Sequence, residues 1–312
     1  MRTVLSVLLA LLLLFPCVSL GEETAAQEPA LLSIPLPMDF SGGCEPGEEY
    51  YLDEYTYEDP TISVKINYRE DLEEYNGAYK GNKKGGVWIV DIRIGDASQL
   101  RTQAAKTFTH KKNGKRTARE MANDVKAVIA FNGDFATNRD EGIIIRQGTT
   151  YLNKLKKVLD VLAIDEDGDF HVFQKPGKGE IGETVDGKKI INAFYFGPIL
   201  VNNGEVPDEF VAKPNFLREE ESYARLALCQ VGPLHYKVLI TTMQDVTIGM
   251  KLKDFARLCR DEGAICAYNL DGGYSAAMVF RGNLVNDTEK ADPRQITDIF
   301  YFASAWNGET VE

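Results

Sequence analysis

The chain has 312 residues, of which 44% are hydrophobic and 26% are charged. This composition is typical of a folded globular protein and excludes an intrinsically disordered chain. The formal net charge of −12 indicates an acidic surface. Because such a surface repels a phosphate backbone, we expect no non-specific nucleic-acid binding, although a single arginine can still hold a small phosphorylated ligand.

The first 21 residues have the pattern of a secretory signal peptide. A positive start at Arg2 precedes an apolar run from Val4 to Phe15, and Ser19-Leu20-Gly21 places small residues before a cleavage site at Glu22. The run is too short for a membrane span, and no long apolar run follows it. We expect residues 1–21 to be removed and the protein to be secreted or extracytoplasmic. An uncleaved N-terminal anchor is the second alternative, and a lipid anchor on Cys17 is the third.

Residues 22–60 differ in composition from the rest of the chain. They contain several prolines and then a stretch from Glu48 to Asp59 that is rich in Glu, Asp and Tyr. This composition predicts a linker or a loosely attached arm. The folded domain is therefore predicted to span residues 61–312.

Within that domain, alternating or continuous apolar runs predict more strands than helices. The expected helices are one that ends at residues 120–123 and an amphipathic one at 252–262 that Gly263 closes. This mixture predicts a single α+β domain with mixed, largely antiparallel twisted sheets flanked by helices. The predicted strands are 61–66, 87–94, 125–131, 142–147, 161–164, 170–173, 194–201, 223–230, 235–242, 264–270, 278–280 and 299–302.

The acidic stretch 165–169 joins two predicted strands. It lacks the glycine position and terminal glutamate of an EF-hand calcium loop, so it predicts a polar hairpin turn instead.

Four cysteines remain after cleavage, namely Cys44, Cys229, Cys259 and Cys266, and they allow three disulfide pairings. Cys229 and Cys266 lie in apolar strands, which favours buried free thiols at these two positions. No Cys-x-x-Cys occurs, so we expect no structural zinc site.

Two polar, glycine-containing turns directly follow buried strands. They are Asn132-Gly133-Asp134 and Asp271-Gly272-Gly273-Tyr274-Ser275. The end of a strand presents side chains to a ligand crevice, and glycine lets backbone N–H groups approach an anion. Asp271 is then a base, a nucleophile or a metal ligand, or it caps its own turn. The residues alone do not separate these readings.

Two arginines are candidates for binding an anion. Arg225 lies inside an apolar strand, where a charge must be paired or face a cleft. Arg294 directly precedes the last strand and is otherwise an ordinary surface charge. The planar guanidinium matches a pair of phosphate oxygens.

Five short motifs follow one another between about residues 87 and 303. They are Ala-Phe-Asn-Gly-Asp-Phe at 130–135 with Gly142, Gly-Pro-Ile-Leu-Val at 197–201 with Gly204, Arg-Leu-Ala-Leu at 225–228, Asn-Leu-Asp-Gly-Gly-Tyr-Ser-Ala-Ala-Met at 269–278 with Gly282, and Ile-Thr-Asp-Ile-Phe-Tyr at 296–301 after Arg294. In this order they resemble the motifs of the phosphodiester glycosidase family. Three features depart from its pattern: Tyr274 replaces a glycine, Ala276 or Ala277 replaces a threonine, and residues 243–245 replace a Gly-Arg pair.

The resemblance implies a hydrolase that cleaves the sugar C1–O bond of a sugar–phosphate diester, with a cell-envelope or exopolysaccharide glycan as the substrate type. It implies Asp271 as base or nucleophile and Arg225 and Arg294 as phosphate ligands. Asn132 and Asp134 would orient sugar hydroxyls or water. The backbone of residues 272–275 would line the floor of the site. Gly133, Gly272, Gly273 and Ser275 are the further residues expected to bind the substrate or its phosphate. No cofactor is required, and a divalent cation held by Asp134 and Asp271 stays an open alternative.

Two other classes of function compete with this one. The departures at Tyr274 and Ala276 keep open a non-catalytic glycan-binding or envelope-assembly module on the same fold. A phosphodiesterase that acts at phosphorus normally needs a metal cluster rich in His and Asp, and the chain has only three histidines.

Overall fold

A computed structural model describes residues 30–80, 83–108, 114–136, 139–241, 249–286 and 294–308. The chain divides into two compact units, Met1–Ala30 and Leu31–Glu312. The predicted signal peptide, residues 1–21, lies outside the described residues. The second unit contains all the helices and strands given below.

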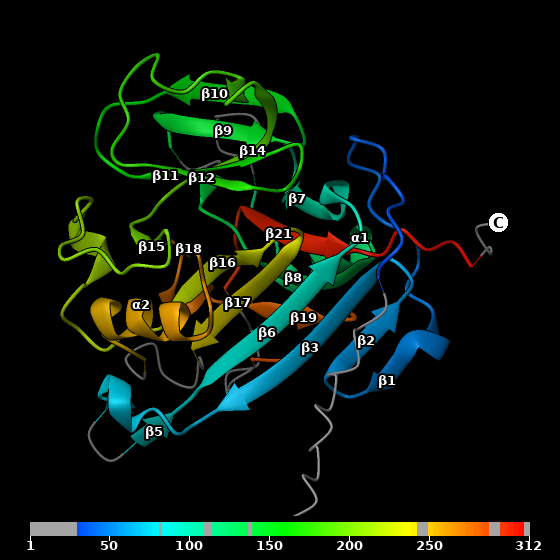
Figure 1. The fold of residues 1–312 in the computed structure, drawn as a ribbon, viewed down its shortest axis with the longest axis horizontal. Helices are drawn as coiled ribbons and strands as arrows, with labels where there is room; N and C mark the ends of the chain where they lie inside the picture. The colour runs from blue at the N-terminus through cyan, green and yellow to red at the C-terminus, as the bar shows by residue number, and fades with distance from the viewer. Residues whose placement is uncertain are drawn as a thin grey trace, which may run out of the picture. The chain divides into compact units, whose positions relative to one another are not determined.

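An eight-stranded antiparallel sheet forms the largest layer of this unit (Figure 1). Its longest strands pair over their full length, with Val64 opposite Ile92 and Val90 opposite Val238. In order across the sheet, the strands are β1 (Tyr51–Asp53), β2 (Thr56–Asp59), β3 (Ile62–Arg69), β6 (Val87–Ile94), β17 (His235–Thr241), β16 (Leu226–Gly232), β18 (Cys266–Leu270) and β15 (Ile199–Asn202).

A second antiparallel sheet has five strands in line, and a sixth strand pairs at its side. The order is β10 (Thr149–Lys154), β9 (Gly142–Arg146), β14 (Lys188–Tyr195), β11 (Val161–Asp165) and β12 (Phe170–Phe173), with β13 (Thr184–Val185) beside β14. The third sheet contains β20 (Asn283–Leu284), β19 (Met278–Phe280), β8 (Ala127–Asn132), β21 (Asp298–Ala303) and β7 (Leu100–Ala104). A small ribbon pairs β4 (Ala78–Lys80) with β5 (Lys83–Gly85).

The central core lies where the three larger sheets meet. Ile92 of β6, Phe131 of β8 and Phe194 of β14 belong to one buried cluster. The rings of Phe131 and Phe300 stack at 5.1 Å between centroids. Because side chains alternate along a strand, β6 sends Ile92 into this core and Ile89 to the opposite face of its sheet.

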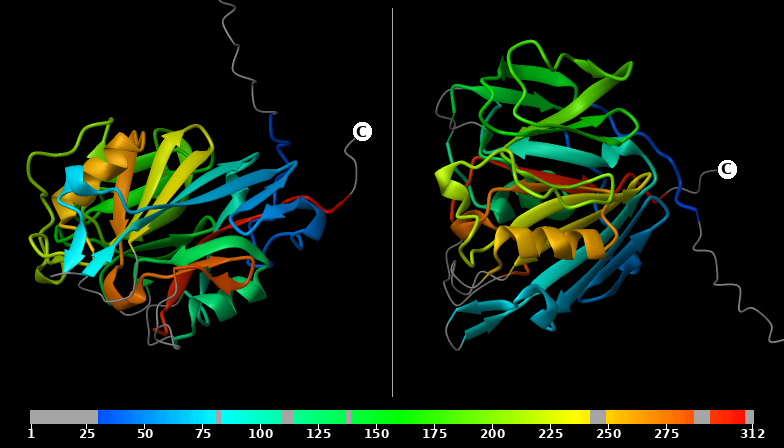
Figure 2. Two further views of the ribbon diagram at one scale, coloured as in Figure 1. Left: turned by 90° about the horizontal axis from the view of Figure 1, so that it is seen from below. Right: turned by 60° about the vertical axis from the view of Figure 1, so that its left-hand side comes forward.

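The described residues form two α-helices, and each covers the outer face of one sheet. Helix α2 (Leu252–Asp261) lies against the eight-stranded sheet (Figure 2). Its Phe255 and Leu258 side chains belong to the buried cluster between the helix and that sheet. Helix α1 (Ala118–Asp124) packs Met121 against the third sheet and starts with a capping box between Thr117 and Glu120. Short 3₁₀ turns occupy Glu48–Tyr50, Glu73–Tyr75, Ala97–Gln99, Asn215–Leu217 and Gly273–Ser275. None of the helices in the described part is long and apolar enough to span a membrane.

The predicted fold is confirmed in part. The strands and both predicted helices occur where expected, but "flanked by helices" overstates two α-helices among the described residues. The sheets are not mixed there, because every described strand pair is antiparallel. The predicted strand at 194–201 is divided, since β14 ends at Tyr195 and β15 begins at Ile199 in a different sheet.

The prediction of a loose arm up to residue 60 is wrong for its last part. Strand β2 pairs with β3, and the Tyr57 side chain is fully buried in the central core. Its hydroxyl donates to Asp59 Oδ2 at 2.9 Å. The compact unit already begins at Leu31, so the sheet extends beyond the predicted domain start. The start of the folded domain was predicted too late because the many acidic residues around Tyr57 are typical of a solvent-exposed segment.

Two local predictions are confirmed. Asp165 Oδ1 accepts the backbone N–H groups of Asp167 and Asp169 at 3.0 Å each, which makes residues 165–169 a polar hairpin turn. Cys229 and Cys266 are buried free thiols, as predicted. Cys259 is also a buried free thiol, and Cys44 is a half-buried free thiol.

Candidate functional site

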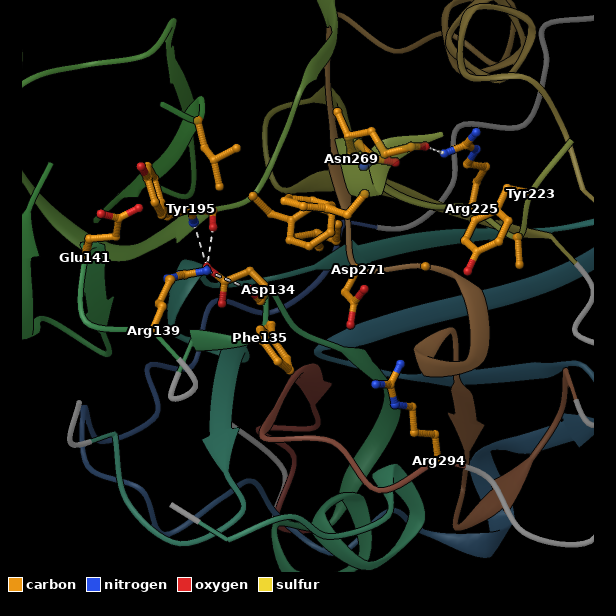
Figure 3. A pocket seen from close by; sticks show the side chains of 17 residues that line it. Asp134, Phe135, Arg139, Glu141, Tyr195, Tyr223, Arg225, Asn269, Asp271 and Arg294 are labelled. Atoms are coloured by element: carbon orange, nitrogen blue, oxygen red, sulfur yellow. Dashed lines mark hydrogen bonds and ion pairs between the residues drawn. The ribbon is translucent and has the colours of Figure 1, made fainter. Parts of the chain in front are cut away.

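A cavity of about 460 Å³ lies where strands β8 and β18 end. The two polar turns predicted from the sequence meet there, since Asp134 and Phe135 follow β8 while Asp271 and Gly272 follow β18. Arg294, which precedes β21, borders the same cavity (Figure 3). The fold therefore brings together segments that lie more than a hundred residues apart in the sequence.

Asp271 presents a half-buried carboxylate to this cavity, directed toward Arg294 (Figure 3). Burial is the largest influence and raises the pKa of Asp271 to about 6. The hydrogen bond from Ser275, the charge of Arg294 and the Gly272 N–H act in the opposite direction, while the charge of Asp298 adds to the increase. A carboxyl group with such a pKa exchanges its proton near neutral pH, which suits acid–base chemistry.

Asn132 fixes the loop that carries Asp271. Its Nδ2 donates to the Asp271 carbonyl oxygen at 2.6 Å, and its Oδ1 accepts the Ala277 N–H at 3.0 Å. Only 1% of Asn132 is exposed. Asn132 was predicted to contact sugar hydroxyls or water. In the structure both ends of its amide have protein partners, so the side chain positions the Asp271 loop.

Asp134 is fully buried and forms the centre of an ion-pair network. Its Oδ2 lies 2.7 Å from Arg139 Nη2 and accepts the Tyr195 N–H at 2.6 Å, while its Oδ1 lies 2.7 Å from Arg146 Nη2. Although burial opposes ionisation, the two arginines hold the pKa of Asp134 below its usual range. Asp134 was predicted to orient sugar hydroxyls or water, and in the structure its carboxylate is paired with protein groups and anchors the wall of the cavity.

The proposed cation site between Asp134 and Asp271 does not fit this geometry. Both carboxylate oxygens of Asp134 face guanidinium groups, which would repel a divalent ion. Among the described residues, no group of three or more His, Cys, Asp or Glu side chains is arranged to hold a metal.

Gly133 gives Asp298 room beside this network. A Cβ atom on Gly133 would lie 2.1 Å from Asp298 Oδ2, and the Gly133 N–H donates to the Asp298 carbonyl at 2.9 Å. The predicted anion contact through this N–H is therefore wrong. Burial and the nearby charge of Asp134 raise the pKa of Asp298, whose Oδ2 is 3.6 Å from Arg146.

The glycine turn after β18 packs against the chain segment that precedes β16. A Cβ atom on Gly272 would lie 2.3 Å from the Ala224 carbonyl oxygen, and the Gly273 N–H donates to that oxygen at 3.0 Å. Gly273 has φ +59°, and the Ser275 N–H returns to the Gly272 carbonyl at 3.1 Å. Because the N–H groups of Gly273 and Ser275 are used within the protein, they do not form the predicted anion-binding floor.

Arg225 was predicted as a phosphate ligand, and in the structure its guanidinium is directed to backbone carbonyl oxygens. It lines the cavity but is only 3% exposed, and its guanidinium donates to the carbonyl oxygens of Leu217, Arg218, Glu221 and Met250 at 2.5–3.1 Å. Burial lowers the pKa of Arg225 to about 10. The side chain therefore holds the 217–221 segment against the cavity.

Arg294 retains the predicted position for binding an anion. It is exposed, lies beside Asp271, and its Nη1 reaches Ser275 Oγ at 3.4 Å. Ser275 itself is buried and hydrogen-bonds the Asp271 carboxylate. Ser275 was predicted to contact a ligand, and in the structure it contacts the candidate catalytic carboxylate of Asp271.

The remaining wall of the cavity is largely aromatic and aliphatic. Phe216 is 52% exposed and packs on Phe196 at 5.2 Å between ring centroids, and Phe135 is 38% exposed. Glu141 at the far end pairs with Lys156 at 2.7 Å. Apolar ring faces beside a few fixed polar groups are typical of small-molecule sites.

Three residues of the site were not predicted from the sequence, namely Arg139, Arg146 and Asp298. Arg146 and Asp298 both belong to strands that are otherwise apolar, and both are nearly fully buried. The same argument that singled out Arg225, a charge inside an apolar strand, would have found them. Arg139 lies in a polar loop and carries no comparable signal.

One family model and several solved structures are similar to this chain. A family model described as phosphodiester glycosidase matches residues 125–303, from the start of β8 to the end of β21. The catalytic domain of zebrafish N-acetylglucosamine-1-phosphodiester alpha-N-acetylglucosaminidase, auto-inhibited by its pro-peptide, is similar in structure. Its TM-score is 0.61 at 17% identity, over 84% of this chain and 87% of that chain.

A hypothetical protein from Synechocystis gives a TM-score of 0.47 at 14% identity, over 77% of this chain and 62% of that chain. No curated protein matches the sequence. At 17% identity the zebrafish structure establishes similarity of fold, and the family model spans both polar turns of the site.

Proposed function

Since the chain belongs to the phosphodiester glycosidase family and is a hydrolase, we propose that it cleaves the sugar C1–O bond of a sugar–phosphate diester outside the cytoplasm. The observation that carries this proposal is the Asp271 carboxylate, which faces the cavity with its pKa raised to about 6 beside the exposed guanidinium of Arg294. The Asp271 carboxylate can act on the sugar carbon, and the Arg294 guanidinium can bind the departing phosphate.

In the proposed reaction, water attacks C1 and loses a proton to Asp271, or Asp271 itself attacks C1 and water later releases the sugar. In both cases the C1–O bond breaks and the phosphomonoester leaves with the bonding electrons. A phosphomonoester is a stable anion, so the leaving oxygen needs little protonation. Arg294 stabilises its charge through charge-assisted hydrogen bonds.

The size and lining of the cavity support a sugar with part of its aglycone. A volume of about 460 Å³ is within the range of small-ligand sites, and the exposed ring face of Phe216 offers a surface for the C–H face of a sugar. The relative from zebrafish is named for a sugar 1-phosphodiester, which favours the same substrate class here. The signal-like residues 1–21 favour an envelope or exopolysaccharide glycan as the source of that diester.

The experiment is sugar release from phenyl phosphodiesters of several hexose and N-acetylhexosamine 1-phosphates by purified residues 22–312. Asp271→Asn is the test variant, and Asp208→Asn is the matched control because Asp208 is exposed and lies outside the cavity. We expect the wild type and Asp208→Asn to release free sugar. We expect Asp271→Asn to lose at least roughly a hundredfold in kcat. Equal rates in Asp271→Asn and the wild type would contradict the role of Asp271.

A non-catalytic glycan-binding module remains the second candidate, because Tyr274 stands where the family has a glycine and is 51% exposed. Binding of a diester to the folded wild type without any sugar release would favour this candidate.

A further inference from the structure

Asn269 has a buried oxygen atom without a hydrogen-bond partner in the wall of the cavity. The residue is 2% exposed and lies near the end of β18, two residues before Asp271 (Figure 3). Its Oδ1 is buried and receives no hydrogen bond from any described residue. Leaving a buried acceptor unpaired destabilises a folded chain by about 1–3 kcal/mol, so such an atom requires an explanation.

The orientation of the Asn269 amide is fixed from its other end. Nδ2 donates to the Gly197 carbonyl oxygen at 2.8 Å, and a carbonyl can only accept, so the amide cannot turn over without losing this bond. The backbone is held as well, because the Asn269 N–H donates to the Pro198 carbonyl at 3.1 Å. The Gly-Pro segment at 197–198 therefore anchors the amino end of the side chain and leaves the oxygen available.

Asn269 lines the same cavity as the candidate catalytic carboxylate. Asn269 and Asp271 both line it, and residues two apart along an extended segment point to the same side, roughly 7 Å apart. The opposite end of the cavity, at Arg294, is the part suited to the phosphate.

We propose that Asn269 determines substrate specificity by accepting a hydrogen bond at Oδ1 from one hydroxyl group of the sugar whose C1–O bond is cleaved. This inference rests on the proposed function. The substrate is then a sugar that carries a hydroxyl at one defined ring position, and a sugar without that hydroxyl leaves the buried oxygen unpaired. A site built in this way rejects the analogue strongly because the cost falls on the protein as well as on the ligand.

A purely structural role of Asn269 does not explain why its buried Oδ1 has no hydrogen-bond partner. Asn192 is a useful comparison because it is fully buried and outside the cavity, and its amide has partners at both ends. Its Oδ1 accepts the Gln147 N–H at 3.2 Å, and its Nδ2 donates to the Leu100 carbonyl at 3.3 Å. An asparagine retained only for packing would be paired in this way.

The test compares kcat/KM for the best-cleaved phenyl phosphodiester with its 2-, 3-, 4- and 6-deoxy analogues, in the wild type, Asn269→Ala, Asn269→Asp and Asn192→Ala. Each ratio of two substrates measured on one preparation is independent of the fraction of folded enzyme, so partial unfolding of a variant does not obscure the result. We expect the wild type to discriminate against one deoxy analogue by roughly 10- to 100-fold.

In Asn269→Ala this discrimination should fall to about twofold while it stays unchanged at the other positions. Asn269→Asp loses the N–H donor that binds the Gly197 carbonyl, so it should also lose the preference. Asn192→Ala should retain the preference in full. Unchanged discrimination in Asn269→Ala overturns this inference while the proposed function stands. No sugar release by the folded wild type from any diester overturns the proposed function first, and this inference with it.

Discussion

Replacing Asp271 by asparagine should make the protein more stable above about pH 6, although it removes the candidate catalytic group. Burial raises the pKa of Asp271 from 3.8 to about 6 in the folded chain. Because one pKa unit corresponds to about 1.4 kcal/mol, ionised Asp271 destabilises the folded state by up to about 3 kcal/mol. Asparagine is never ionised and avoids this cost.

The sign and pH range follow from the raised pKa. The folded state prefers the protonated carboxyl, so its stability is unaffected at low pH, falls as the pH rises through the interval from 3.8 to about 6, and is lowest above it. The full value is an upper bound, since Asp271 is partly exposed and the substitution weakens its contacts with Arg294 and Ser275. We therefore expect Asp271→Asn to exceed the wild type by about 1–3 kcal/mol near pH 7.5 and to equal it near pH 4.

Urea unfolding at several pH values between about 4 and 8 measures this difference, with Asp208→Asn as the control. Asp208 is exposed, so its variant should follow the wild type within about 0.5 kcal/mol at every pH. A difference that does not depend on pH, or an Asp271→Asn protein that is less stable than the wild type near pH 7.5, would refute the reasoning.

Three further substitutions test the framework of the site. Asp134→Asn leaves the buried Arg146 and the partly buried Arg139 without their carboxylate partner and should lower the free energy of unfolding by about 3–5 kcal/mol in urea. Gly133→Ala brings a methyl group to 2.1 Å from Asp298 Oδ2 and should destabilise by about 1–3 kcal/mol, whereas Gly182→Ala meets open space and should stay within about 0.5 kcal/mol. Arg225→Lys keeps the charge but loses the planar fork, so limited proteolysis should cleave the 213–221 segment faster.

Different results would contradict each of these expectations. Wild-type stability of Asp134→Asn would mean that the buried ion pairs contribute nothing to the folded state. A Gly133→Ala protein as stable as Gly182→Ala would mean that Asp298 moves aside without cost. Equal cleavage rates for Arg225→Lys and the wild type would mean that other contacts hold the segment.

The strands and the position of the candidate carboxylate were predictable because they depend on local patterns. Apolar alternation at 87–94 identifies β6 over its whole length, and helical spacing at 252–262 identifies α2. Asp271 follows a buried strand directly, and a strand end commonly borders a ligand site.

The hydrogen-bond partners of the polar residues were not predictable in this way. Asp134 pairs with Arg146 twelve residues later, and its charge raises the pKa of Asp298, which is 164 residues away. Arg225 was recognised as a charge that needs a partner, but only the folded chain shows that backbone carbonyls satisfy it. Long-range contacts of this kind decide whether a polar residue meets a ligand or supports the fold, and no local pattern contains them.

The most direct test of the central claim is the position of bond cleavage, measured by hydrolysis of a sugar–phosphate diester in ¹⁸O-labelled water. Mass spectrometry of the released phosphomonoester distinguishes the two bonds, since its oxygens do not exchange with water under mild conditions. Cleavage at the sugar C1–O bond predicts a phosphomonoester without label. Incorporation of one ¹⁸O atom into the phosphomonoester would show attack at phosphorus and would contradict the glycosidase mechanism proposed for Asp271.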